Sequence, residues 1–383
     1  MMGNPSGAAP SRGRIVQLDT LRGIAVMLVF LHHGFSAYAR GQDAEAGLLA
    51  MIDFGRMGIV VFFLISGFVI VRAIRDRTPA AAGLFWTHRF FRLFPAYWLA
   101  VVVAGLLSIA GIPRLSNLAS TITFTDFLAN LTMMPHLLGA RMAIGVFWTL
   151  QIELIFYMLI CLAVLAWPIG RRGYAAFAFG FFALSIIYAG ALVALHRADH
   201  LSTDMIYLGL LHLSIMFCGA GLRLHWEARG GESRRFIATM PLELKLYFGA
   251  VVGFLAFYTL GKIRAGFDIH TFRAVGSYTI AFAIFLIGVE RLGESRIGKF
   301  LGDRSYSFYL LHLPVLALLY AATLSSSGDP LLPLAGYVVL GFGLSVLASS
   351  IMYRFVERPS NRFGHRLRAP APARIEGTAA AAD

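Results

Sequence analysis

The stretch LDTLRGIAVMLVFLHH, from Leu18 to His33, is apolar except near its two ends, and it decides how the chain folds. Arg22 and His33 lie eleven residues apart in it, almost three turns of an α-helix, so they share one helix face. The helical rise places His33 roughly 16 Å along the axis from Arg22. If Arg22 marks a membrane edge, His33 lies near the midplane. An ionisable side chain there costs about 2.5 kcal/mol or more to insert and indicates a functional site.

The composition of the 383-residue chain places this helix in a membrane protein with several spans. Hydrophobic residues make up 58% of the sequence and charged residues 14%, whereas soluble domains carry about 25% charged residues. The 39 glycines and 32 phenylalanines fit closely packed transmembrane helices. Both cysteines lie inside apolar runs, so we expect reduced core thiols and neither a disulfide nor a zinc site.

Apolar windows of about 17 to 25 residues predict an all-α, polytopic membrane fold with about ten transmembrane helices. The predicted spans are residues 19–39, 55–72, 93–112, 144–167, 174–195, 204–224, 245–262, 273–291, 305–324 and 332–355. A weaker pattern at 121–138, interrupted by Pro135, predicts a partly helical segment at the membrane surface. We expect residues 1–14 to be a flexible N-terminus, 15–360 to form the membrane domain, and 361–383 to be a basic, then low-complexity, disordered tail.

Lysine and arginine are unevenly divided between alternate loops. Of the 33 basic residues, 25 fall at the termini or in the loops on the same side, and 8 fall in the other loops. The positive-inside rule therefore predicts that both termini are cytoplasmic. This topology, together with anionic lipid headgroups, explains the net charge of +13, so no nucleic-acid partner is expected.

Six sequence motifs follow one another along the chain. They are LDTLRGIAVMLVFLHH, GIVVFFLISGFVI from Gly58, HRFFRLFPAYW from His88, WTLQIELIFY from Trp148, LGDRSYSFYLLH from Leu301, and FVERP from Phe355. In content and order they resemble the acyltransferase 3 family of integral-membrane acyltransferases, over nearly all of residues 15–360. The family's basic residue, ten intervening residues and histidine fall on Arg22 and His33. His88 departs from the family, because a basic Arg or Lys is usual at the first position of its motif.

The resemblance implies an enzyme of the bacterial inner membrane. Such an enzyme transfers an acyl group, often acetyl, from cytoplasmic acyl-CoA to a hydroxyl or amino group of a sugar. The sugar belongs to a cell-surface or exported glycan or to a glycolipid. Acyl-CoA, the sugar-containing acceptor and membrane lipids are thus the expected partners, and acetyl-CoA is the expected donor.

His33 is the expected general base. An acceptor hydroxyl has a pKa far above neutral, so its attack on a thioester needs a base, and histidine is the usual one. Asp19 or Glu153 could orient the His33 ring by the logic of a catalytic triad, and the sequence leaves both open. Glu153 could equally bind the acceptor or neutralise an arginine, because a buried carboxylate must be paired or protonated. The alternative role for His33 is that of a core histidine hydrogen-bonded between helices.

Arg89 and Arg92 are expected to bind acyl-CoA, with Arg22 as a third candidate. They lie three residues apart in the basic loop that enters the predicted third span, and so on one helix face. Guanidinium groups bind phosphates bidentately, and coenzyme A carries a pyrophosphate and a 3′-phosphate. Their alternative is an anchoring role at lipid headgroups.

Four more residues are expected to line the substrate cavity: Ser66, Trp148, Tyr306 and His312. Ser66 precedes Gly67, but no G-x-S-x-G elbow surrounds it and no base lies at a defined spacing. We therefore favour close helix packing over a nucleophilic role for this pair. Trp148 could instead belong to an interfacial aromatic belt, and His312 could simply hydrogen-bond between helices.

A transporter or flippase is the main alternative class, since the same buried His, Glu and Arg side chains would serve coupling or substrate binding. It predicts flux without consumption of CoA. A non-catalytic scaffold gives no reason for the spacing of Arg22 and His33. We expect no metal, because the eleven histidines are scattered and only His32 and His33 are adjacent, on different faces of a helix. The acceptor, the acyl chain length, the oligomeric state and the choice between direct transfer and an acyl-enzyme relay stay open.

Overall fold

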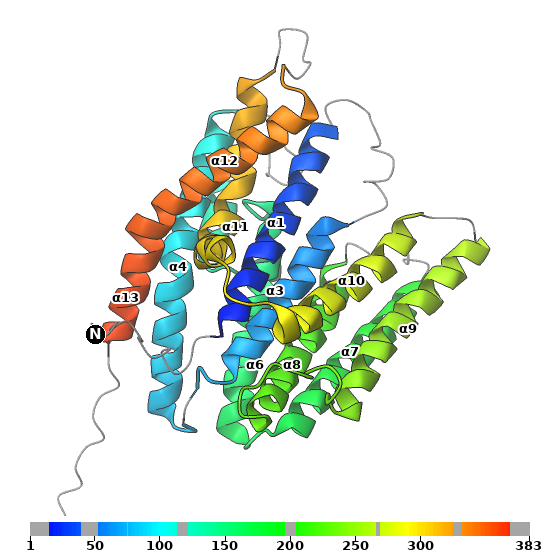
Figure 1. The fold of residues 1–383 in the computed structure, drawn as a ribbon. Coiled ribbons are helices and arrows are strands. Elements are labelled where there is room, and N and C mark those ends of the chain that lie inside the picture. Colours follow the sequence, from blue (N-terminus) through cyan, green and yellow to red (C-terminus); the bar gives the residue numbers. More distant parts are fainter. Residues whose placement is uncertain are drawn as a thin grey trace, which may run out of the picture.

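The computed structural model of the protein is an all-α bundle (Figure 1). It describes residues 15–39, 53–74, 76–112, 122–195, 204–265, 269–324 and 331–367. The helices are α1 (Val16–Ala39), α3 (Phe54–Ile70), α4 (Pro79–Ile109), α5 (Phe124–Leu131), α6 (Trp148–Ala166), α7 (Arg171–Ala194), α8 (Met205–Ala228), α9 (Leu242–Ala265), α10 (Ile269–Arg291), α11 (Arg296–Ala322), α12 (Leu334–Met352) and α13 (Arg358–Arg366). Short 3₁₀ turns η1 (His136–Leu138) and η2 (Gly145–Phe147) precede α6, and a π-helical turn, η4 (Tyr353–Glu357), joins α12 to α13.

The predicted membrane fold is confirmed. Within the residues that the structure describes, nine helices are long and apolar enough to cross a membrane. The short apolar α3, with 17 residues, corresponds to the predicted span at 55–72. Its rise of about 26 Å approaches the hydrocarbon thickness of a bilayer, about 30 Å. The chain is therefore a multi-pass integral membrane protein. The cytoplasmic location of the termini stays a prediction.

The predicted start of the third span was wrong. Helix α4 begins at Pro79, well before residue 93, and runs for 31 residues. Thr78 caps it by accepting a hydrogen bond from the backbone N–H of Ala81, and proline fits the first turn because its missing N–H has no helical partner there. The hydropathy pattern treated the basic residues as a boundary. Arg89 and Arg92 consequently lie inside a helix and not in a loop.

The segment between α4 and α6 is partly helical, as predicted. Asp126 and Asn130 of α5 hold it together: Asp126 accepts the backbone N–H of Arg141, and the Asn130 side chain bonds to the backbones of Arg141 and Ala143. The hydrogen bond from the backbone N–H of Arg141, followed by two from Thr123, lowers the pKa of Asp126. This network fixes the chain that leads into α6.

Helix α13 runs to Arg366, past the expected domain boundary at residue 360. The rest of the expected tail lies outside the described residues. Pro95 inside α4 cannot donate to the carbonyl of Phe91, and the Ser360 hydroxyl donates to that carbonyl at 2.7 Å instead. Phe91 lies between the two α4 arginines in sequence, so α13 supports the part of α4 that carries them.

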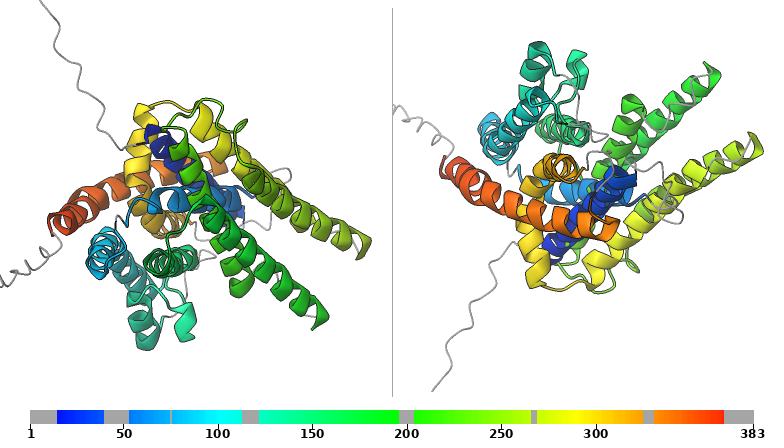
Figure 2. Two further views of the ribbon diagram at one scale, coloured as in Figure 1. Left: turned by 90° about the horizontal axis from the view of Figure 1, so that it is seen from below. Right: turned by 90° about the horizontal axis from the view of Figure 1, so that it is seen from above.

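Glycine allows the central helices to approach closely. A Cβ atom at Gly67 of α3 would lie 1.9 Å from the carbonyl oxygen of Met216 in α8. A Cβ atom at Gly302 of α11 would lie 2.2 Å from the carbonyl oxygen of Asp19 in α1. The predicted packing role of Gly67 is thus confirmed. Seen along the perpendicular views of Figure 2, α7 and α9 extend away from the rest of the bundle.

The bundle has two ends, which we call proximal and distal. The proximal end is the end at which α1 and α4 begin, and the distal end is the opposite one, at which α3 and α6 begin (Figure 1). The contact of His32, near the end of α1, with Asp53, which caps α3, marks the distal end.

Candidate active site

A pocket of about 730 Å³ lies in the proximal half of the bundle, between α1, α3, α4, α6 and α11. We call it the arginine pocket. Its polar lining consists of Arg22, Ser66, Arg89, Arg92, Thr149, Glu153, Tyr157, Ser305, Tyr306 and Tyr309. The fold therefore brings Arg22 of α1 together with Arg89 and Arg92 of α4, the three expected CoA-binding arginines.

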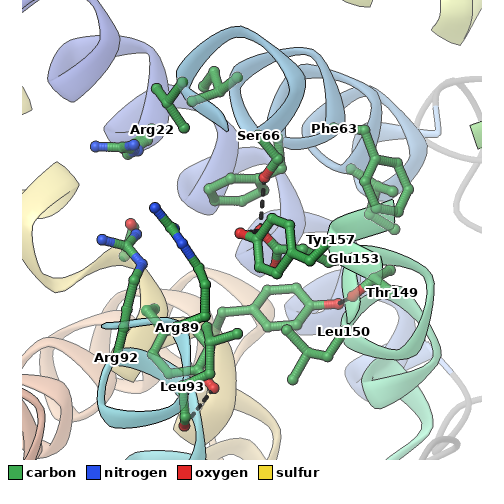
Figure 3. A pocket seen from close by; sticks show the side chains of 17 residues that line it. Arg22, Phe63, Ser66, Arg89, Arg92, Leu93, Thr149, Leu150, Glu153 and Tyr157 are labelled. Carbon is green, nitrogen blue, oxygen red and sulfur yellow. Dashed lines mark hydrogen bonds between the residues drawn. The ribbon is translucent and has the colours of Figure 1, made fainter. Parts of the chain in front are cut away.

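The guanidinium groups of these three arginines face the same space (Figure 3). Arg22 lies 3.5 Å from Asp19, and Arg89 lies over the Tyr157 ring, 5.2 Å from its centroid. In the described part of the chain, neither Arg89 nor Arg92 forms an ion pair with a carboxylate, and the buried Nε of Arg89 has no hydrogen-bond partner. Converging cations with unused donors are suited to an anionic ligand.

Glu153 is the carboxylate of the arginine pocket. Its Oε1 accepts hydrogen bonds from the Ser66 hydroxyl at 2.8 Å and from the Tyr157 hydroxyl at 2.5 Å (Figure 3). The sequence showed no partner for Ser66 at a defined spacing; the fold brings Glu153, 87 positions away, within hydrogen-bond distance of it. Glu153 thus shares a pocket with the arginines.

A second pocket, of about 940 Å³, lies toward the distal end. We call it the histidine pocket. Its polar and aromatic lining consists of His32, His33, Asp53, Arg56, Trp148 and His212. Ile59 lines both pockets, and Phe63 of the arginine pocket packs against the rings of Trp148 and His212. The two pockets are therefore neighbours, separated by a thin layer of apolar side chains.

His33 belongs to the histidine pocket and is buried, with 8% of its surface exposed. Its ring centroid lies 5.2 Å from that of His312. His32 lines the same pocket; its ring lies edge-on to that of His33, with 5.0 Å between centroids, and its Nδ1 lies 3.5 Å from Asp53. Asp53 also accepts the backbone N–H of Arg56 and lies 3.4 Å from the Arg56 guanidinium.

Asp19 cannot orient His33, so this prediction was wrong. Helix α1 is continuous from Val16 to Ala39, and His33 follows Asp19 by fourteen positions, which correspond to about 21 Å along its axis. A shared helix face was mistaken for proximity. Asp19 instead accepts a hydrogen bond from Arg22, one turn away on α1.

The four expected cavity residues are divided between the sites. Ser66 and Tyr306 line the arginine pocket, and the Tyr306 hydroxyl donates to the carbonyl of Leu93 in α4. Trp148 lines the histidine pocket. His312 lines neither of these two pockets; it is wholly buried behind the His33 ring.

Sequence reasoning missed several residues of the two pockets. Tyr157 could have been found, because it lies one helical turn after Glu153 and shares its helix face. Asp53, Arg56 and His212 had no local signal. The apolar sequence of α8 is typical of a helix with a core histidine, and the hydrogen bond that His212 accepts from Tyr278 is visible only in the structure.

No cluster of three or more metal-ligating side chains occurs among the described residues. The polar groups of the two pockets are arginine, histidine, carboxylate and hydroxyl side chains. These residue types can bind anions, accept protons and hydrogen-bond to hydroxyl groups.

Comparison with known proteins agrees with this picture. The family described as "Acyltransferase domain" matches residues 15–354. O-acetyltransferase OatA of Staphylococcus aureus (strain NCTC 8325 / PS 47) is 25% identical, over 91% of this chain and 57% of its own length. Nodulation protein 10 of Rhizobium leguminosarum bv. viciae is 24% identical, over 81% of this chain and 85% of its own. No solved structure matches.

The family match covers almost the whole membrane bundle, including every residue of both pockets. This chain spans little more than half the length of the Staphylococcus protein. The shared region is thus the membrane part described above. The chain belongs to the acyltransferase 3 family of membrane acyltransferases.

Proposed function

We propose that this protein transfers an acyl group, in the first instance acetyl, from cytoplasmic acyl-CoA to a sugar hydroxyl of a glycan or glycolipid. The observation that carries the proposal is the convergence of three arginines in one pocket that adjoins the pocket of a buried histidine. The name of the Staphylococcus relative, an O-acetyltransferase, supports acetyl as the group and oxygen as its destination.

The arginine pocket is the proposed donor site. Arg22, Arg89 and Arg92 would bind the phosphates of CoA, which are the strongest anionic feature of that molecule. Arg22 and His33 are separated by about 16 Å along α1. The long phosphopantetheine arm of CoA suits this gap and would carry the thioester past Ile59, which lines both pockets. The positive-inside pattern supports donor entry from the cytoplasm at the proximal end.

The histidine pocket is the proposed acceptor site. Trp148 offers an apolar ring face, while Asp53 and Arg56 offer an acceptor and donors for hydroxyl groups. Ring faces of a sugar are apolar and its edges are polar, so this mixture of side chains suits a saccharide. The position toward the distal end lets the acceptor enter from the side opposite to CoA.

His33 would act as the general base. The acceptor oxygen attacks the thioester carbon, and its proton moves to a ring nitrogen of His33. When the tetrahedral intermediate collapses, the C–S bond breaks and the CoA thiolate takes that proton. Glu153 lies with the arginines and would balance their charge when the donor site is empty.

The test uses the purified protein in nanodiscs with ¹⁴C-acetyl-CoA, measuring donor binding and transfer to a panel of saccharide acceptors. His33→Ala is expected to bind acetyl-CoA and transfer nothing, whereas Arg92→Ala is expected to lose binding. Arg362→Ala, which removes an exposed arginine of α13, is the matched control and should behave as the wild type. Absence of binding and turnover in the wild type, with acetyl-CoA and with longer acyl-CoAs, would contradict the proposal and favour a transporter.

A further inference from the structure

His312 is buried at the centre of the bundle, between the two pockets. It lies in α11, and none of its surface is exposed. Its ring contacts His33 of the histidine pocket, with 5.2 Å between centroids, and Tyr309 of the arginine pocket, with 5.8 Å between centroids. The Tyr309 hydroxyl is itself held by Thr149 and by the carbonyl of Val146. His312 is therefore held in a rigid environment directly against the proposed base.

The hydrogen bonds of His312 fix its tautomer. Its Nδ1 lies 2.8 Å from the carbonyl oxygen of Tyr309 and 3.2 Å from that of Phe308. Carbonyl oxygens only accept, so Nδ1 carries the proton, and in the neutral ring Nε2 then carries a lone pair. Nε2 is buried and has no hydrogen-bond partner among the described residues. A buried acceptor without a donor costs stability, which makes this atom an exception that calls for a functional explanation.

We propose that His312 is the positioning residue of His33, in the role for which sequence reasoning expected a carboxylate. Its Nε2 would accept the ring N–H of His33 during transfer and so direct the other ring nitrogen of His33 toward the acceptor. Catalytic hydrogen bonds are often long in unliganded proteins and tighten when substrates bind, which fits the present separation of the rings. The inference rests on the proposed acyl transfer.

The proton balance is complete without another reactant. The proton of the acceptor hydroxyl moves to one ring nitrogen of His33, and the N–H of the other ring nitrogen donates to Nε2 of His312. The imidazolium of His33 is thereby stabilised, as a carboxylate stabilises it in a serine protease. When the C–S bond breaks, the proton leaves His33 for the CoA thiolate. His312 remains neutral throughout, so no further charge is buried beside His33.

Neither of the two carboxylates that the sequence suggested is as well placed as His312 to orient His33. Asp19 lies about 21 Å along α1 from His33. Glu153 lines the other pocket and accepts hydrogen bonds from Ser66 and Tyr157. His312 is in ring contact with His33 and has an unused acceptor.

Two substitutions of similar size separate a positioning role from a structural one. His312→Gln places an amide oxygen near the position of Nε2, whereas His312→Asn places an amide nitrogen near Nδ1 and can keep the bonds to the α11 carbonyls. The readouts are kcat for acetyl transfer by the nanodisc protein, KM for acetyl-CoA, and acetyl-CoA binding. We expect His312→Asn to lower kcat about 100-fold and His312→Gln to stay within about tenfold of the wild type, with KM and binding unchanged.

The outcomes separate the role of His312 from the proposed acyl transfer. A kcat for His312→Gln that does not exceed that of His312→Asn at least tenfold overturns the positioning role, and so does loss of acetyl-CoA binding in either variant. The wild type reports on the proposed function separately: if it shows no acetyl transfer, the proposed function fails. If it is active while the two variants are equal, only the role of His312 fails.

Discussion

The arginine pocket and the histidine pocket differ in how their charges are arranged. In the arginine pocket, three cations converge on one carboxylate, and two of the three have no ion-pair partner within the described residues. In the histidine pocket, the charged side chains are largely paired with one another through Asp53. The first pocket therefore has an excess of positive charge for an anion, while the second is close to balanced and offers hydrogen bonds. A donor with phosphates and an acceptor with hydroxyls suit these two environments in that order.

The largest effect should come from removing the base and leaving the donor site intact. We expect His33→Ala to reduce kcat for acetyl transfer by about 10² to 10⁴, because no other group would take the acceptor proton. The Kd for acetyl-CoA, measured by equilibrium binding, should stay within about twofold, since His33 lines only the histidine pocket. His136→Ala, which removes an exposed histidine of η1 outside both pockets, is the matched control. Equal losses in the two variants would contradict the assignment of His33.

The second test changes the hydrogen-bonding geometry of Arg92 and keeps its positive charge. We expect Arg92→Lys to raise the Kd for acetyl-CoA about 10- to 100-fold, since a lysine cannot make the bidentate bond of a guanidinium to a phosphate. At saturating acetyl-CoA, kcat should be nearly unchanged. An unchanged Kd with a reduced kcat would instead place Arg92 with the reacting atoms and would weaken the contrast between the two pockets.

The sequence predicts one pocket better than the other, and the reason is physical. The spans, the Arg22–His33 spacing and the arginine pair of α4 follow from hydropathy and helical periodicity, which are local properties. The partnership of Ser66 with Glu153 and that of His33 with His312 depend on which helices pack together, and no local pattern encodes that.

This difference between local patterns and helix packing also explains where the sequence-based predictions were wrong. Helical periodicity placed Asp19 on the face of His33 but gave no weight to the distance along the axis. The start of α4 was missed because its capping signal, Thr78 before Pro79, is independent of hydropathy. These pocket residues were missed because Asp53 and Arg56, at the start of α3, and His212, inside α8, become a set only in the fold.

A third test affects the wall that both pockets share. Helix α3 supplies side chains to each pocket and crosses α8 at Gly67, where a methyl group would collide with the carbonyl of Met216. We expect Gly67→Ala to lower the free energy of unfolding by about 1 to 3 kcal/mol, visible as a lower thermal midpoint in nanodiscs. Donor affinity and acceptor turnover should fall together.

The matched control for this test is Gly249→Ala. Gly249 lies in α9, and a Cβ atom there would meet nothing within 4 Å, so stability should be unchanged or slightly raised. Loss of acetyl-CoA affinity in Gly67→Ala without loss of acceptor turnover would show that the packing of α3 does not support both pockets.

The smallest effect should come from the network that leads into Trp148. Asp126 accepts the backbone N–H of Arg141 and thereby holds the segment that ends at the wall of the histidine pocket. Asp126→Asn keeps an acceptor but loses the charge, so we expect a rise of only a few-fold in KM for the acceptor and no change in acetyl-CoA affinity. A change in donor affinity instead would mean that this segment acts on the bundle as a whole.

The pH dependence of the same network follows from the lowered pKa of Asp126. A carboxyl whose pKa is lower in the folded protein stabilises the fold above its unfolded pKa, about 3.9, and loses that contribution as pH falls through the folded value. Hydrogen-exchange protection of the backbone around Arg141, expressed relative to an unfolded peptide, should therefore be constant from pH 7 to about 5 and decline below about 4. In Asp126→Asn, protection should be lower at pH 7 and should lack this decline. A decline centred near pH 6 in the wild type would show that a histidine, and not Asp126, controls the protection of this segment.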